Sequence, residues 1–102
     1  MTKEIRELEK YIEDIWQFLP IPVCYINSNN IIVAASASFT KFSGYESEEA
    51  VGIEIETLFT NQQQIKEIEK EILKTDSVSN RVTIFITKEK NEVPVLLSAT
   101  AR

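Results

Sequence analysis

Few side chains in this sequence could do chemistry, and the types that are missing exclude most enzyme mechanisms. The 102 residues include no histidine and one cysteine, Cys24. Without histidine, Ser-His-Asp and Cys-His catalysis, histidine-ligated haem and most zinc sites are excluded. Glycine occurs twice, and no phosphate-binding motif of the GxGxxG or GxxxxGK[ST] type is present. The sequence therefore predicts a domain that is not itself an enzyme and has no evident cofactor or metal.

The remaining candidates are Cys24 and the adjacent carboxylates of Glu48 and Glu49. Cys24 lies in an apolar run, where burial raises the pKa of a thiol and suppresses its reactivity. Packing is the favoured role for Cys24, and thiol sensing is the alternative. Most glutamates stand beside lysines at helical spacing, which is typical of a solvated helix face. Glu48 and Glu49 are interpreted as surface residues rather than as an acid-base pair.

The elements that position these residues begin with a hairpin. Two apolar runs, residues 23–26 and 31–35, flank the polar residues 27–30, whose sequence is Asn-Ser-Asn-Asn. Asn tolerates the left-handed backbone of a tight turn, and Asn and Ser side chains hydrogen-bond their own backbone. Ser36 then provides a helix N-cap. The pattern predicts two antiparallel strands that lead directly into a helix.

This opening resembles a PAS domain, and the resemblance extends over roughly Phe18 to Arg102. The matching positions are Tyr25-Ile26-Asn27, Asn30-Ile31-Ile32-Val33, Phe39-x-x-Phe42-Ser43-Gly44-Tyr45, Glu48-Glu49, Val51-Gly52 and Leu58-Phe59. Three positions depart from the family pattern: Asn27 replaces the usual turn Asp, Asn30 the usual turn Gly, and Ser36 a frequent Asn. The resemblance implies an α+β fold, with a PAS-like antiparallel sheet that has helices on one face and an N-terminal amphipathic helix.

The first nineteen residues are predicted to form that amphipathic helix, and residues 20–102 the PAS domain. Apolar residues repeat at spacings of three and four, as in the heptads of a coiled coil: Ile5, Leu8, Ile12, Ile15 and Leu19, widened by Trp16. Two heptads are too short to form a stable coiled coil alone. The apolar stripe must therefore pack on the domain's own sheet or on a second copy, and the second alternative is favoured.

The second half of the chain predicts one longer helix and a second hairpin. Asn61 and Gln64 have the spacing of a capping box, and isoleucines at 65, 68 and 72 share a helix face. Residues 78–87 and 93–101 then form two strands with bulk on both faces, so the sheet is expected to be covered on both sides. A PAS sheet ordinarily has a fifth strand, and the sequence ends where the fourth would end. We expect a rearranged pairing or a strand from another copy to replace it.

Strand alternation and helical spacing, combined with the resemblance, predict a mostly apolar pocket. The candidates are Cys24, Ile26, Ile32, Ala34, Ser36, Phe39, Phe42, Val51, Leu58, Ile68, Thr83, Phe85, Val95 and Leu97. Because ligand sites usually also contain a few polar groups, this apolar lining favours a collapsed core that binds no ligand. The alternative is a pocket that binds a small apolar ligand. Light-sensing PAS domains hold their flavin-reactive cysteine in an Asn-Cys-Arg-Phe sequence. In this chain the corresponding residues 52–55 are Gly-Ile-Glu-Ile and include no cysteine, so a photoactive flavin is disfavoured.

The opposite face of the sheet, with the N-terminal helix, is the expected dimer contact. Its residues are Val23, Tyr25, Ile84, Ile86 and Leu96. The resemblance implies a sensory and dimerisation module of a cytoplasmic signalling protein, most often a sensor histidine kinase in a two-component system. The alternatives are a constitutive, ligand-free assembly module and a PAS module of a transcriptional regulator. The net charge of −5 opposes direct contact with nucleic acid or an anionic membrane.

Overall fold

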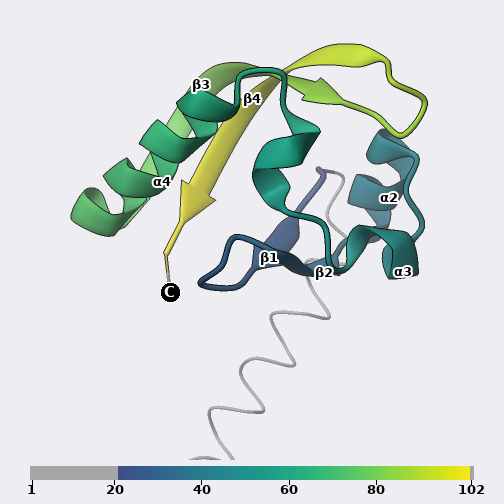
Figure 1. Ribbon diagram of the computed structural model, residues 1–102, viewed down its shortest axis with the longest axis horizontal. Helices are drawn as coiled ribbons and strands as arrows, with labels where there is room; N and C mark the ends of the chain where they lie inside the picture. The colour runs from purple at the N-terminus through teal and green to yellow at the C-terminus, as the bar shows by residue number, and fades with distance from the viewer. Residues whose placement is uncertain (1–20, 102) are drawn as a thin grey trace, which may run out of the picture. The chain divides into compact units, whose positions relative to one another are not determined.

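The computed structural model describes residues 21–101 and divides the chain into two units, Met1–Gly52 and Ile53–Arg102. Along the chain, two strands are followed by the helices and then by two further strands (Figure 1). The first unit holds strands β1 (Cys24–Ile26) and β2 (Ile32–Ala35) and helices α2 (Ala37–Ser43) and α3 (Ser47–Ala50). The second holds the 3-10 helix η1 (Ile55–Leu58), helix α4 (Gln62–Thr75) and strands β3 (Ser77–Ile86) and β4 (Glu92–Thr100). This is the predicted α+β fold; the predicted N-terminal helix lies outside the described residues.

The first hairpin forms where the Asn-rich turn predicted it. Asn30 adopts a left-handed backbone with φ of 61°. The Asn27 side chain accepts hydrogen bonds from the backbone N–H groups of Asn29 and Ile31, at 2.9 and 3.2 Å. β1 and β2 pair antiparallel, with Cys24 opposite Ala35 and a register shift after Tyr25. The side-chain oxygen of Asn27 thus stabilises the turn between the two strands by accepting these hydrogen bonds.

Two short helices follow this hairpin, and each begins at a residue whose side chain caps it. Ser36 caps α2, as the sequence predicted, and Glu46 caps α3 through a reciprocal capping box with Glu49. Gly44 ends α2 with φ of 83°, a conformation that glycine adopts without steric cost. The backbone N–H of Gly52 donates to the carbonyl of Ile32 at 2.9 Å, which ties the end of this segment back to β2.

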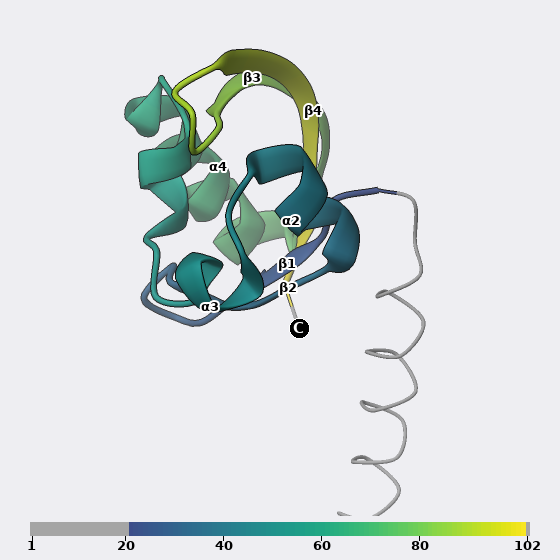
Figure 2. The ribbon, with the colours of Figure 1, turned by 90° about the vertical axis from the view of Figure 1, so that its right-hand side faces the viewer.

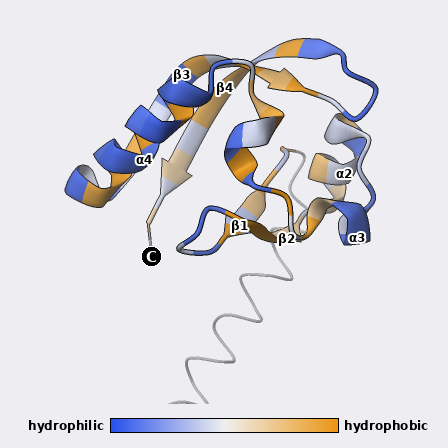
Figure 3. Ribbon diagram, in the orientation of Figure 1, coloured by the Kyte–Doolittle hydropathy of each residue, from blue (hydrophilic) through white to orange (hydrophobic). Residues whose placement is uncertain are grey.

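Helix α4 is amphipathic, and its turns alternate hydrophobic and hydrophilic residues in Figure 3. Ile65 and Ile68 are buried, and Asp76 ends the helix in a left-handed conformation. Asn61 caps the helix by accepting from the N–H of Gln64 at 3.0 Å, but the second half of the predicted capping box is replaced. The Gln64 side chain instead donates to the carbonyl of Val82 at 2.9 Å, which fastens α4 to β3.

The second hairpin is long, and β3 and β4 run side by side through both views (Figures 1 and 2). Thr83 pairs with Val95 and Phe85 with Val93. The register shifts between Val78 and Arg81, where three steps along β3 match two along β4. The described residues therefore form two separate two-stranded sheets, one in each unit. A five-stranded sheet is not present among residues 21–101.

Candidate functional site

The buried face of the second hairpin carries two residues of the predicted pocket lining, Thr83 and Phe85. Thr83 and Phe85 are 4% and 3% exposed, while their neighbour Val82 is 69% exposed. The rings of Phe85 and Phe59 meet edge to face, with centroids 5.5 Å apart. Leu58, Ile65 and Ile68 are also buried. These buried side chains are all apolar except Thr83, which has a hydroxyl group.

That hydroxyl, Thr83 Oγ1, has no hydrogen-bond partner although it is fully buried. A buried polar group without a partner costs free energy, and in folded proteins such groups are few. Among the predicted pocket residues of this unit, Thr83 is therefore the one whose side chain could still bind something. On β4, the predicted lining residues Val95 and Leu97 are half-buried, and the intervening Leu96 is 66% exposed.

In the first unit, the predicted lining residues do not all turn inward. Ile32, Ser36 and Phe39 are buried, and Cys24, Ala34 and Phe42 are half-buried. Ile26 and Val51 are instead exposed at 41% and 49%. The register shift after Tyr25 breaks the strict alternation on which the prediction for β1 and β2 rested. Val51 has left the helix at the extended C-cap of α3.

The same shift brings a residue to the interior that the sequence analysis did not select. Ala35, not Ala34, stands opposite Cys24, and Ala35 is buried. Phe59 was also left out of the predicted lining, although it faces Phe85. The isolated bridge between these two residues explains its place, and this bridge joins segments that local sequence patterns do not connect.

The buried serine hydroxyls of the first unit accept hydrogen bonds from backbone N–H groups. Ser36 Oγ accepts from the N–H of Phe39 at 3.2 Å and from that of Val23 at 3.0 Å. Ser43 Oγ accepts from the N–H of Tyr45 at 3.2 Å. The Cys24 thiol is protected by its surroundings, because burial raises its pKa to about 11. These groups hold backbone or fill space, and none presents a reactive atom at neutral pH.

The outer face of the second hairpin exposes large apolar side chains. Val82, Leu96 and Ile84 are 69%, 66% and 38% exposed. Ile86, on the same predicted face, is half-buried, as are Val23 and Tyr25 in the first unit. The heptad residues Ile5, Leu8, Ile12, Ile15, Trp16 and Leu19 lie outside the described residues. Of the predicted contact residues in the described part of the chain, Ile84 and Leu96 are exposed. Together with Val82, which the sequence analysis did not select, they form a surface patch, here called the outer patch.

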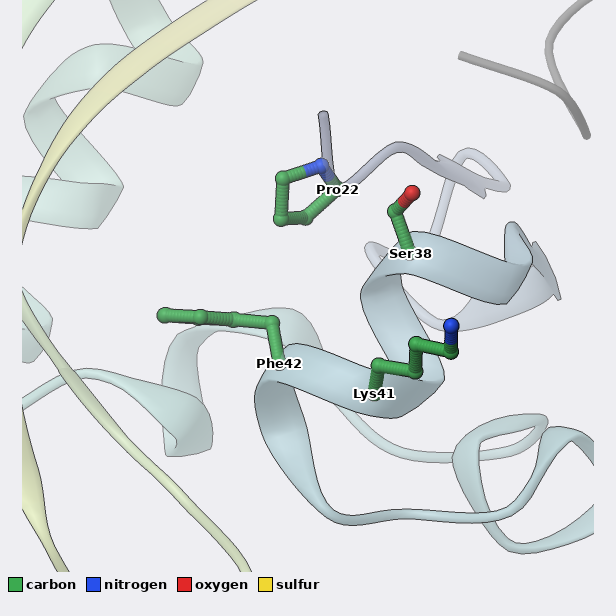
Figure 4. A pocket seen from close by; sticks show the side chains of 4 residues that line it. All are labelled: Pro22, Ser38, Lys41 and Phe42. Carbon is green, nitrogen blue, oxygen red and sulfur yellow. The ribbon is translucent and has the colours of Figure 1, made fainter. Parts of the chain in front are cut away.

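A hollow lies in the first unit, between the start of β1 and helix α2 (Figure 4). It is open to solvent and lined by Pro22, Ser38, Lys41 and Phe42. Phe42 alone among these belongs to the predicted pocket. A single lysine beside a proline ring gives no constellation of polar groups that would select a ligand.

Within residues 21–101, no three carboxylate, thiol or imidazole groups are close enough together to hold a metal ion. No helix of the same segment is long and apolar enough to cross a bilayer.

Comparison with known proteins agrees with this fold. The PAS domain family model matches residues 20–102, so the chain belongs to the PAS domain family. The PAS domain of a protein from Colwellia psychrerythraea superposes with a TM-score of 0.74 at 11% identity, over 83% of this chain and 74% of that one. A variant of the fungal photoreceptor VVD superposes with a TM-score of 0.60 at 18% identity. That match covers 76% of this chain and 61% of the photoreceptor. No curated protein matches the sequence.

Proposed function

We propose that this PAS domain is the sensory and dimerisation module of a cytoplasmic signal-transduction protein, with a sensor histidine kinase as the parent. The observation that supports a transmitting role is the outer patch. Three large apolar side chains are exposed on β3 and β4, on the opposite face from the buried Thr83 and Phe85. Exposed apolar side chains gathered on one face of a hairpin favour a protein contact.

The alternation of side chains along β3 connects the outer patch to the buried face of the hairpin. Ile84 lies between Thr83 and Phe85 in sequence, and successive side chains of a strand point to opposite faces. A displacement of β3 caused on its buried face therefore moves the outer patch as well. A partner that binds the outer patch more tightly in one arrangement shifts the equilibrium between the two arrangements, and the two faces become coupled.

The heptad stripe of the first nineteen residues is the proposed partner for this surface, within a homodimer. Five apolar residues repeat along it, and the sequence continues into β1 after two prolines. An apolar helix face and an apolar sheet face both lose exposed surface when they meet. The helix would then pass a shift of the sheet on to a neighbouring domain or to the second copy.

The first experiment measures the mass of the protein by native mass spectrometry. The double variant Ile12→Glu/Ile15→Glu removes two stripe residues and changes the net charge by −2. Lys10→Glu changes the charge by the same amount at a polar position and is the matched control. We expect a dimer in the wild type and the control and a monomer in the double variant. An unchanged dimer in the double variant would contradict the helix-mediated contact.

A second pair of variants tests the outer patch itself. Val82→Glu/Leu96→Glu places two charges on the patch, and Ser77→Glu/Ser79→Glu places two on exposed polar positions of β3. Only the first pair should lower the dimer fraction. Equal dimer fractions in the two double variants would show that the patch takes no part in assembly.

The unpartnered hydroxyl of Thr83 supports a second candidate function, the binding of a small neutral ligand. Its apolar surroundings would strongly disfavour a charged ligand, because burying an unpaired charge is costly. Protein isolated from its native host and sprayed gently should carry added mass that is lost on denaturation. Thr83→Val removes the hydroxyl and should lose the ligand, whereas Thr83→Ser should retain it. Wild-type protein without added mass would leave a ligand-free assembly module as the function.

A further inference from the structure

The N-terminal part of β3 contains one residue more than a regular ladder with β4 requires. Ser79 and Asn80 together stand opposite the single residue Ser98. This is a β-bulge, and the extra residue reverses the alternation of side chains between the two faces of the hairpin. Val78, before the bulge, is therefore buried at 4% exposure, whereas Val82, after it, is 69% exposed. Bulges of this kind are over-represented next to functional sites.

Two local features hold the bulge in place. Asn80 adopts a left-handed backbone with φ of 54°, a conformation that asparagine tolerates better than most residues. The backbone N–H of Asn80 donates to the side-chain oxygen of Ser98 at 3.0 Å. Both residues are exposed, so neither feature depends on a buried apolar contact. A single substitution at either position can therefore remove one of these features.

The segments before and after the bulge are attached to different partners. After the bulge, Arg81 forms an ion pair with Glu71, which lies in helix α4. Before the bulge, Asp76 ends α4, and its carbonyl accepts from the backbone N–H of Ala101 at 2.8 Å. The bulge thus lies between a contact that ties α4 to β3 and one that ties the end of α4 to the chain at the end of β4. A change in the bulge must move the second contact relative to the first.

The sequence before Arg81 also fits a ladder without a bulge. If the pairing continued regularly from Arg81, Ser79 would take the place opposite Ala99, and Val78 would move to the outer face of the hairpin. Residues 98–100 of β4 are Ser-Ala-Thr, whose small side chains fit opposite either set of partners. Among the residues of β3 that precede Arg81, Val78 is the only apolar one whose burial favours the observed register.

We propose that this bulge is a conformational switch between two registers of β3. The bulged register is the one described above, and in the second, here called the flat register, residues 77–79 are shifted by one position along β4. The shift moves the end of α4 by about 3.3 Å along β4 and breaks the bond between Asp76 and Ala101. It also exchanges Val78 for Ser79 in the interior. A molecule that binds the end of α4 or the outer face at Val78 therefore shifts the ratio of the two registers.

Thiol reactivity distinguishes the two registers. In a Cys24→Ser background, the thiol of Val78→Cys is buried in the bulged register and exposed in the flat one, and that of Ser79→Cys is the reverse. Asn80→Val disfavours the left-handed backbone and so favours the flat register, whereas Asn80→Gly keeps the bulge and is the matched control. Relative to this control, Asn80→Val should speed alkylation at position 78 about tenfold and slow it at position 79.

Two results of this experiment would overturn the switch. An equal alkylation rate at position 78 in the Asn80→Val and Asn80→Gly variants would show that the bulge does not flatten. Faster alkylation at both positions 78 and 79 would show that the start of β3 opens as a whole, without a change of register.

A pair of disulfide traps reports the registers with Asn80 unchanged. In the Cys24→Ser background, Val78→Cys/Ala99→Cys places two thiols opposite each other only in the bulged register, and Val78→Cys/Thr100→Cys only in the flat one. Both disulfides should form within one chain, the second more slowly because the flat register is less populated. Val78→Cys/Ser98→Cys is opposed in neither register and is the control. If the trap at position 100 closes no faster than this control, the flat register does not exist.

Hydrogen exchange on the two trapped proteins tests the link to α4. The N–H of Ala101 should exchange faster in the protein trapped through position 100, because its bond to Asp76 is broken there. The N–H of Thr60, which donates to the carbonyl of Ile84 after the bulge, should exchange equally in both. Equal exchange of Ala101 in both trapped proteins would overturn the link to the end of α4. These measurements do not require a dimer, so their failure is distinct from a failure of the proposed function.

Discussion

The hydroxyl groups buried in residues 21–52 and in residues 53–101 differ in what they bind. In the first unit, Ser36 accepts two backbone N–H groups and Ser43 accepts one. In the second, the buried hydroxyl of Thr83 has no partner.

The difference separates side chains that build the fold from groups that remain available. A buried polar group is normally satisfied because the desolvation cost is otherwise uncompensated. The first unit meets that requirement with its own backbone, at the cap of α2 and at the turn that follows this helix. The second unit leaves the buried hydroxyl of Thr83 without a partner. Of these buried hydroxyls, only that of Thr83 is therefore left for a ligand to bind.

The thiol of Cys24 gives the largest expected effect. If burial suppresses the reactivity of the Cys24 thiol, Cys24 should react with iodoacetamide far more slowly in the folded protein than in urea. A pKa raised from 9.0 to about 11 lowers the thiolate fraction at pH 8 by roughly 100-fold. Mass spectrometry of the alkylated protein measures both rates. Comparable rates would mean that Cys24 is reactive, which restores thiol sensing as a role.

Substitution of Ser36 should show how much a buried, hydrogen-bonded hydroxyl contributes to stability. Ser36→Ala leaves the N–H groups of Val23 and Phe39 without their acceptor and should lower the free energy of unfolding by about 2 kcal/mol. For a domain of this length the midpoint of thermal unfolding falls by about 10 °C. Ser28→Ala, in the exposed turn, is the control and should change little. A Ser36→Ala variant as stable as the control would remove the contrast with Thr83.

The elements with local causes were predictable from the sequence. The hairpin follows from the Asn side chains of residues 27–30, the start of α2 from Ser36, and α4 from the spacing of its isoleucines. The alternation of Val82, Thr83, Ile84 and Phe85 between faces is likewise a property of one strand, and their exposures agree with it. Each of these features depends on residues within about one turn or one strand of each other.

The features that sequence patterns missed depend on pairing between distant residues. One extra residue in β2 at the shift after Tyr25 put Ala35 rather than Ala34 opposite Cys24. One extra residue in β3 near Asn80 reverses the alternation, so Val78 is buried although Val82 is exposed. Such bulges are set by the register with a partner strand, and the strand that contains them gives no periodic signal for them.

Thr83→Val reverses the sign of the effect expected for Ser36. Valine keeps the branched shape and removes a hydroxyl that has no partner, so the ligand-free protein should gain about 1 kcal/mol in free energy of unfolding. Thr87→Val is the matched comparison, because the Thr87 hydroxyl accepts from the N–H of Asn91 at 3.1 Å and its loss should destabilise. Urea unfolding of both variants measures the difference. If Thr83→Val is destabilising, the hydroxyl has a partner, such as a bound water or ligand.

Two glutamates of α4 give the smallest expected effects, with opposite signs, and they test how much carboxylate charges contribute to stability beside the buried hydroxyls. A hydrogen bond from Arg81 lowers the pKa of Glu71. Desolvation, followed by the nearby charge of Glu56, raises the pKa of Glu69. Glu71 therefore stabilises the fold above the pKa it has in the unfolded chain, and this contribution is lost as the pH falls through its lower folded value. Glu69 behaves oppositely, because its folded form holds a proton more tightly and stability falls as the pH rises through its raised pKa.

At pH 7, Glu71→Gln should therefore lower the midpoint of thermal unfolding slightly, and Glu69→Gln should raise it. Both differences from the wild type should shrink as the pH falls toward 3, where the wild-type carboxylates also become neutral. Thermal unfolding followed by circular dichroism across this range measures both curves in the same buffers. The Glu71 effect should also weaken with added salt, because the pair with Arg81 is partly exposed to solvent. Differences from the wild type that stay constant between pH 7 and pH 3 would show that the two substitutions act through packing rather than through charge.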